Sequence, residues 1–240
     1  MRIILLPFTA ALAIACQGQV LLSDSLLQTL SAGELGGQGI PSPQYGVSIH
    51  KLVYATTDAF GAATAASGAL VLPNAPWCDL PLFAYDHGTV TGRNEVPSRL
   101  SYEILVGKYM GSSGFVSVLP DYLGLGDSPG MHPYIHAVTE ATATIDMLRA
   151  AREYCSVHGI GLNGEVFLAG YSQGGHAAMA THRMIQEQFP DEFNVVASAP
   201  CSGPYDCSGV QASVITADES YPAPYYLPYI LLAYKDIYPG

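Results

Sequence analysis

Apolar residues along the chain fall into two kinds of segment. Short apolar runs at residues 80–85, 115–119, 166–169 and 195–199 stop at turn-forming residues. In residues 136–155 and 174–188, which lie between these runs, apolar positions recur at helical spacing. Two further strand-like runs precede them, at residues 47–56 and 66–72. Strands that alternate with helices predict the α/β class, with a mostly parallel sheet and helices on both of its faces.

The remaining segments carry weaker signals. We expect a helical or irregular lead-in at residues 23–30 and a loop at residues 33–44, where Gly and Pro are frequent. In the helix predicted at 136–155, Glu140 falls outside the apolar face. The tyrosine-rich tail has two interpretations: a helix that opens at Pro228 and covers an apolar site as a lid, or an ordinary packed helix.

Residues 170–174 read Gly-Tyr-Ser-Gln-Gly, a G-x-S-x-G motif between a predicted strand and a predicted helix. A strand that turns directly into a helix forces the central residue to a strained, positive φ, which exposes the serine hydroxyl. The helix N-terminus beneath it favours developing negative charge. Ser172 is therefore a candidate nucleophile, and Gly170 and Gly174 leave room for the turn. The alternative is a serine that only caps the helix.

Four polar residues follow predicted strands closely: His87, Asp121, Ser172 and Ser202. In open α/β sheets, ligands bind at the carboxyl ends of the strands. We therefore expect these residues to lie at one edge of the sheet, where the functional site would be.

Composition narrows the class of protein. The 240 residues are 49% hydrophobic and only 12% charged, which predicts one sizeable globular domain rather than a disordered chain. The formal net charge is −11 and no basic patch is present, so a nucleic-acid partner is not expected.

The N-terminus resembles a targeting segment. Arg2 precedes an apolar stretch at residues 3–15 that is too short to span a bilayer as a helix, and Ala13 and Ala15 provide the small residues of a cleavage site. Residues 1–15 are thus a predicted signal peptide, and the protein is expected to be secreted, periplasmic or in the cell envelope. Cys16 follows directly, which leaves open a lipid anchor at this residue as the one predicted contact with a membrane.

Export predicts an oxidising compartment, in which cysteines can pair. Beyond Cys16 the chain has Cys78, Cys155, Cys201 and Cys207. Four cysteines allow three connectivities, and their spacing does not select one.

Three motifs, in this order, resemble the α/β-hydrolase superfamily: residues 85–89 (Tyr-Asp-His-Gly-Thr), 121–126 (Asp-Tyr-Leu-Gly-Leu-Gly) and 170–175. The likeness is greatest to secreted bacterial hydrolases and fungal secretory lipases, and it covers about residues 45–240. It implies an α/β-hydrolase core at 45–215, preceded by a lead-in at 16–44 and followed by the start of a cap, or lid, at 216–240.

The resemblance also assigns roles. Ser172 would attack the carbonyl of a small-molecule ester or lipid, and the backbone N–H groups of Thr89 and Gln173 would form the oxyanion hole. His87 would be a structural loop residue, and His176 would have the wrong chain order for catalysis. No metal or organic cofactor is implied.

Two further expectations depend on the same fold. Its topology brings Cys78 and Cys155 to one end of the sheet and Cys201 and Cys207 into one loop, which implies the disulfides Cys78–Cys155 and Cys201–Cys207. Asp206 follows the last predicted strand, where a minority of the superfamily places its catalytic acid; the alternative is a turn residue.

The superfamily's triad runs Ser, then Asp or Glu, then His along the chain. Here the last histidine is His182, on the predicted helix that follows Ser172. We therefore expect an N-terminal fragment of a carboxylic-ester hydrolase, truncated before its last strands and inactive without its general base. A serine peptidase of the same fold and a non-catalytic, hydrolase-like binding protein are the alternatives.

Overall fold

The computed structural model describes residues 18–75, 78–221 and 223–238. The predicted signal peptide and the candidate lipid-anchor residue Cys16 lie outside these ranges.

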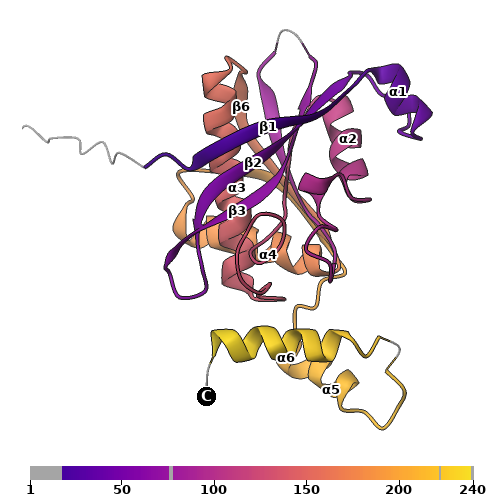
Figure 1. Ribbon diagram of the computed structural model, residues 1–240, viewed down its shortest axis with the longest axis vertical. Coiled ribbons are helices and arrows are strands. Elements are labelled where there is room, and N and C mark those ends of the chain that lie inside the picture. Colours follow the sequence, from indigo (N-terminus) through magenta and orange to yellow (C-terminus); the bar gives the residue numbers. More distant parts are fainter. Residues whose placement is uncertain (1–17, 76–77, 222, 239–240) are drawn as a thin grey trace, which may run out of the picture.

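In this part of the chain, seven strands form one sheet in the order β1-β2-β3-β5-β4-β6-β7 (Figure 1). The strands are β1 (Leu21–Leu30), β2 (Val47–Thr57), β3 (Ala63–Pro73), β4 (Leu80–Asp86), β5 (Val116–Pro120), β6 (Leu162–Tyr171) and β7 (Asn194–Cys201). Strand β4 pairs in parallel with β5 and β6, and β6 pairs in parallel with β7. Strand β2 pairs antiparallel with β1 and β3, and β3 pairs antiparallel with β5. All strands except β1 and β3 therefore run in one direction, which confirms the predicted mostly parallel sheet.

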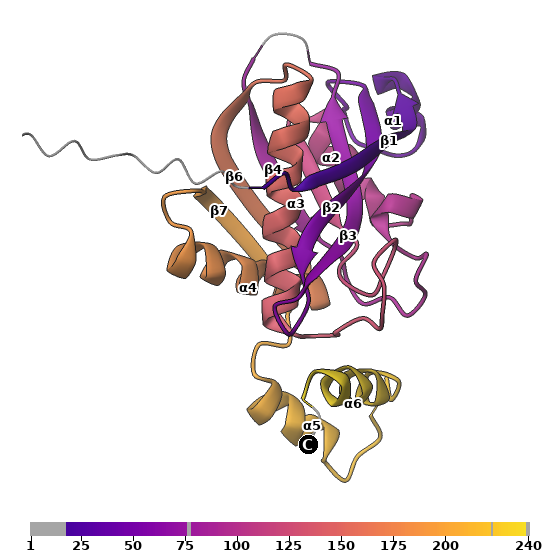
Figure 2. The same cartoon turned by 60° about the vertical axis from the view of Figure 1, so that its left-hand side comes forward.

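Helices cover both faces of the sheet, as predicted. The helix α2 (Ile104–Ser112) lies on one face, and α3 (Ala137–Val157) and α4 (Gln173–Gln188) lie on the other (Figures 1 and 2). The smaller helices are α1 (Ala32–Gly37), a 3₁₀ turn (Pro97–Arg99), a π turn (Cys207–Gln211) and α5 (Ala212–Ile215). Figures 1 and 2 both show α5 and the last helix, α6 (Tyr226–Ile237), as a layer below the sheet.

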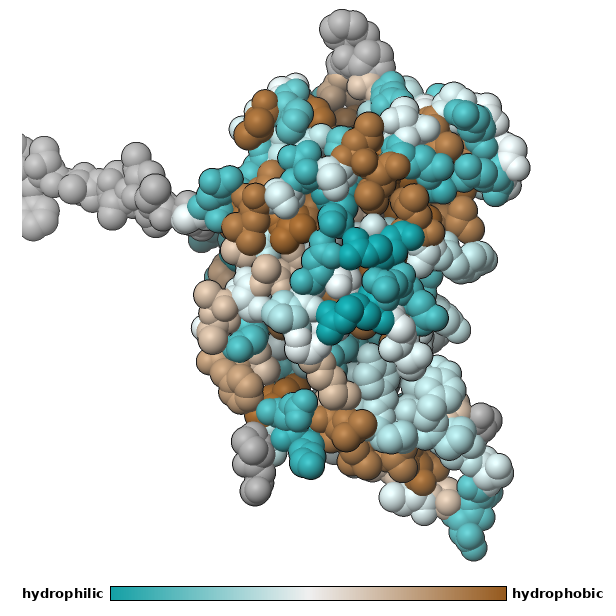
Figure 3. Space-filling view, viewed as in Figure 1, coloured by the Kyte–Doolittle hydropathy of each residue, from teal (hydrophilic) through white to brown (hydrophobic). Residues whose placement is uncertain are grey.

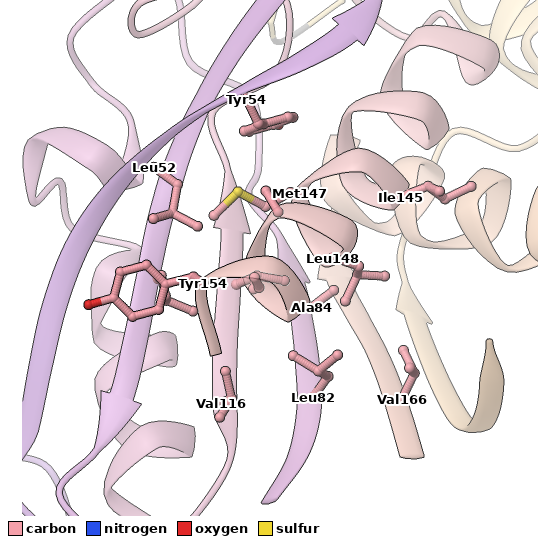
Figure 4. Close-up of a cluster of buried hydrophobic side chains, with 14 of the residues drawn as sticks. Leu52, Tyr54, Leu82, Ala84, Val116, Ile145, Met147, Leu148, Tyr154 and Val166 are labelled. Carbon is pink, nitrogen blue, oxygen red and sulfur yellow. The ribbon is translucent and has the colours of Figure 1, made fainter. Parts of the chain in front are cut away.

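The larger hydrophobic core lies between the sheet and α3 (Figure 4). Leu82 and Ala84 of β4 pack there with Met147 and Leu148 of α3, and all four are almost fully buried. A second cluster on the opposite face joins Ile104 of α2 to residues of β2, β3 and β5. Strand β5 contributes Val116 and Val118 to the larger core and Leu119 to the second cluster, so it is covered on both faces.

Two N-terminal predictions are wrong. Residues 23–30, expected to be a helical or irregular lead-in, belong to β1, which pairs antiparallel with β2 at the edge of the sheet. Its register shifts twice and most of its side chains are exposed, so its local pattern is that of neither a buried strand nor a helix. Residues 33–37 of the segment expected to be loop belong to α1 (Ala32–Gly37), whose first turn is closed by a capping box between Ser31 and Glu34.

Neither predicted disulfide is present in the structure: Cys78, Cys155, Cys201 and Cys207 are free thiols. Cys155 is buried in the larger hydrophobic core, and burial raises the pKa of its thiol to about 12. At the end of β7, the Cys201 thiol donates to the Ala199 carbonyl, and beyond this strand the Cys207 thiol donates to the Pro204 carbonyl.

Burial in the core between β4 and α3 predicts how much a truncated side chain lowers the free energy of unfolding. Leu82 is 1% exposed, so Leu82→Ala should lower the free energy of unfolding by about 2–5 kcal/mol, because it removes buried methyl groups and leaves a cavity. The matched control is Leu22→Ala in β1, where the side chain is 55% exposed and the change should stay within about 0.5 kcal/mol. Urea unfolding monitored by circular dichroism measures both. Equal losses in the two variants would contradict this assignment of the core.

Candidate active site

Ser172 occupies a sharp turn between β6 and α4. Its φ is 58° and its ψ is −120°, a conformation that is strained for a residue with a side chain. Its N–H donates to the Cys201 carbonyl at the end of β7 (3.0 Å), and its carbonyl accepts from the His176 N–H (3.2 Å). The side chain is half-buried at the end of the sheet where the parallel strands terminate. The structure therefore has the strand–turn–helix geometry that the motif predicts.

Both motif glycines are required by close backbone contacts. A Cβ on Gly170 would lie 2.0 Å from the Gly174 carbonyl oxygen, and one on Gly174 would lie 1.8 Å from the Asp86 carbonyl oxygen. This turn, residues 170–174, is called the elbow below, and it is packed directly against the end of β4. This contact explains why the turn can remain strained.

The loop after β4 lies beside the elbow and contains Thr89. The Gly88 N–H donates to both carboxylate oxygens of Glu103 (3.0 and 3.1 Å), and the Thr89 hydroxyl bonds the Tyr134 hydroxyl (2.9 Å). Within the described residues, the backbone N–H groups of Thr89 and Gln173 have no intramolecular hydrogen bond. Both groups are free to bind a ligand, and Gln173 is the first residue of α4, where a helix leaves its N–H groups unpaired.

The structure gives His87 and Asp121 structural contacts. The His87 ring packs on Tyr122 with ring centroids 4.4 Å apart, and its nitrogens contact backbone carbonyls. The Asp121 carboxylate accepts from the Ser67 hydroxyl (2.6 Å) and the Ser98 N–H (2.9 Å). Burial raises the pKa of Asp121. Both residues hold loops around the site and do not reach Ser172.

A buried polar network lies beneath the elbow, and the sequence pattern did not reveal it. Glu140, expected outside the apolar face of its helix, is 1% exposed and accepts from the Gln173 side-chain amide (2.9 Å). Its other oxygen pairs with Nδ1 of His176 (2.6 Å). The Gln173 amide also donates to Nε2 of His132 (2.7 Å). The only sequence signal was an acidic residue in the first turn of α3.

The loop after β7 contains Asp206 and Ser202. The Asp206 carboxylate accepts from the N–H groups of Gly209 (2.8 Å) and Val210 (3.1 Å), so it caps the π turn. Ser202 has a φ of 53° and lies near Ser172. Asp206 is exposed and makes no hydrogen bond to a histidine within the described residues. The contacts of Asp206 are therefore those of a turn residue.

A cavity of about 220 Å³ opens beside Ser172. It is lined by the elbow, the loop after β7 and the C-terminal helices, namely by Tyr134, Ile135, Ser172, Gln173, Ser202, Gly203, Pro204, Cys207, Gln211, Ile215, Tyr221, Tyr226 and Ile230. A larger cavity of about 740 Å³ is lined by His87, Thr89 and Glu103, among others. The candidate nucleophile and the loop of Thr89 thus each border open space.

The helix α6 is fastened to the rest of the molecule by tyrosines. The hydroxyls of Tyr229 and Tyr234 donate to the carbonyls of Val90 (3.2 Å) and Ile135 (2.9 Å), and the ring of Tyr229 stacks on Tyr134 at 4.4 Å. The helix begins at Tyr226, two residues before the predicted start at Pro228. It covers one side of the cavity and still exposes Leu231 and Leu232, and Figure 3 shows hydrophobic side chains over α5 and α6.

Across residues 18–75, 78–221 and 223–238, no histidine forms a hydrogen bond with the Ser172 hydroxyl. In the same ranges, no helix has the length and apolar character needed to cross a membrane.

Comparison with solved structures gives the fold and its relatives. A candidate hydrolase from Legionella pneumophila is 31% identical and superposes with a TM-score of 0.84, over 92% of this chain and 62% of that one. The rice cell wall degrading esterase LipA from Xanthomonas oryzae is 33% identical, with a TM-score of 0.82 over 92% and 61%. Candida antarctica lipase A, 17% identical with a TM-score of 0.66 over 92% and 49%, shares the fold.

The chain therefore spans about three fifths of the length of its bacterial relatives. No curated protein matches its sequence. Residues 98–220, slightly more than half of the chain, match the family model described as secretory lipase, and this segment includes the elbow, α3 and the loop after β7. Together with the seven-stranded sheet of the described residues, the match shows that the chain belongs to the secretory lipase family and has the α/β-hydrolase fold.

Proposed function

We propose that the full-length protein is an exported hydrolase of carboxylic esters that forms an acyl-enzyme on Ser172. The observation that carries the proposal is the strained backbone of Ser172, at the N-terminus of α4 and at the wall of a cavity. Membership of the secretory lipase family and the likeness to an esterase support the same class of reaction.

The proposed reaction uses groups that border the elbow. The Ser172 oxygen attacks the ester carbonyl, and the N–H groups of Gln173 and Thr89 donate to the resulting oxyanion. Collapse of the tetrahedral intermediate expels the alcohol and leaves an acyl ester on Ser172, which water then hydrolyses. The Ser172 proton must pass to a general base. The described residues offer no histidine bonded to Ser172, so the proposal assigns the base, and the acid that orients it, to residues outside them.

The cavity favours esters whose acyl or alcohol group is apolar. Tyr134, Tyr226 and Ile230 are among the residues that line the cavity beside Ser172. Aromatic and aliphatic walls bind apolar groups by excluding water from them. Export follows in this proposal from the predicted signal peptide and from the secretory family, with a lipid anchor at Cys16 as an alternative to free secretion.

Removal of the nucleophile tests the proposal. In the full-length protein, Ser172→Ala should abolish labelling by a fluorophosphonate probe and lower kcat/KM for p-nitrophenyl butyrate by at least about 10⁴-fold. The matched control is Ser156→Ala, an exposed serine at the C-terminus of α3, which should keep both activities. A folded full-length protein that neither hydrolyses esters nor reacts with the probe would contradict the proposal and would favour a non-catalytic binding protein.

The elbow glycine gives a second test. Gly174→Ala places a methyl group where the Asp86 carbonyl oxygen would be 1.8 Å away, so the turn must shift. Because displacements of about 1 Å can cost 100-fold in rate, the probe should label Ser172 at least about 100 times more slowly. Gly33→Ala in α1 is the control: its nearest neighbour is 3.9 Å away, and labelling should be unchanged. Equal labelling rates for the two variants would argue against a reactive elbow.

A further inference from the structure

The side chain of Gln173 is buried beneath the elbow and bonds Glu140 and His132, whereas its backbone N–H is the group assigned to the oxyanion hole. We propose that Glu140 and His132, by holding this side chain, are positioning residues for the oxyanion hole: they fix the Gln173 N–H in the place where the substrate oxygen becomes negative. The inference rests on the proposed function, and it gives a role to residues that do not touch substrate.

The side-chain amide of Gln173 is held in one orientation. Its two N–H donors are used by Glu140 Oε1 (2.9 Å) and His132 Nε2 (2.7 Å). Nδ1 of His132 contacts the Leu123 carbonyl oxygen (2.8 Å), a bond in which the ring must donate, so Nε2 is left as an acceptor. Burial lowers the pKa of His132 to about 4, which keeps the ring neutral and able to accept at neutral pH.

Glu140 contacts two residues in the first turn of α4. One carboxylate oxygen accepts from Gln173 and the other pairs with His176, three residues further along the same helix. Residues three apart lie on the same side of a helix, so the two bonds fix both the rotation and the position of this turn against α3. A buried carboxylate persists only where its oxygens are bonded in this way.

The bonds of the Gln173 side chain to Glu140 and His132 affect the reaction because of where Gln173 lies. Gln173 directly follows the strained Ser172 and is the first helical residue, so no helical hydrogen bond holds its N–H. An oxyanion-hole donor acts only if its direction is set before the reaction. The side chain of Gln173, tied to α3 and to the loop of His132, supplies that constraint one residue from the nucleophile.

The test removes the side-chain hydrogen bonds of Gln173 and keeps its backbone N–H. Gln173→Met keeps the side-chain volume and the backbone N–H but has no side-chain donors. In the full-length protein we expect kcat for p-nitrophenyl butyrate to fall about 10- to 100-fold, with KM within about twofold, because loss of a complete oxyanion donor costs about 10²–10³. The control is Gln186→Met, an exposed glutamine of the same helix, which should keep wild-type kinetics.

Variants of Glu140 separate positioning from general stability. Glu140→Gln can still accept from Gln173 and donate to His176, so kcat should stay within about fivefold of wild type. Glu140→Leu should lower kcat as Gln173→Met does. The double variant Glu140→Leu/Gln173→Met should be little slower than either single variant, because both substitutions break the same contact between Glu140 and Gln173.

The outcomes distinguish the two proposals. A folded Gln173→Met with unchanged kcat in an active protein overturns the positioning role and leaves the proposed function intact. If that variant does not fold, Glu140→Leu with wild-type kcat overturns it equally. A wild-type protein with no esterase activity and no probe labelling overturns both proposals.

Discussion

The local structure depends on one constraint, the strained backbone of Ser172. A non-glycine residue at φ 58° and ψ −120° relaxes unless its surroundings prevent it. Three contacts keep the Ser172 backbone from relaxing: the Cys201 carbonyl accepts from the Ser172 N–H, the end of β4 packs against Gly174, and Glu140 of α3 bonds the Gln173 side chain. Each contact comes from a segment distant in the chain. The strained turn therefore depends on contacts that the assembled sheet and α3 supply, and the Ser172 side chain stays half-buried rather than enclosed.

Buried and half-buried carboxylates hold the loops around this turn. Glu103 binds the Gly88 N–H, Asp121 binds Ser67 and Ser98, and Glu140 binds Gln173 and His176. Asp86, fully buried at the end of β4, accepts from the Thr144 hydroxyl, and burial raises its pKa well above the usual range. A carboxylate accepts several hydrogen bonds from backbone and side-chain donors, which suits it to irregular segments that lack a strand or helix partner.

The sequence allowed the main features of the fold and the elbow to be predicted, because both follow from local patterns. Apolar runs bounded by turn residues became β4, β5, β6 and β7, with ends within a few residues of the prediction. The G-x-S-x-G spacing became a positive-φ serine between strand and helix, with glycines where a Cβ would clash. By contrast, β1 was missed because an exposed edge strand has no distinctive pattern, and its place is set by pairing with β2.

The sequence by itself thus determined the class of fold, the positions of its central strands along the chain and the residue at the elbow, because these depend on the chemistry of neighbouring residues. Tertiary structure decided the rest: that the four cysteines of the described residues are free thiols, that Asp206 caps a turn, and that Glu140 is buried under the nucleophile. These outcomes depend on which distant segments meet and which way each side chain faces. A glutamate in a helix has the same local pattern whether its partner is water or a glutamine that lies 33 residues away.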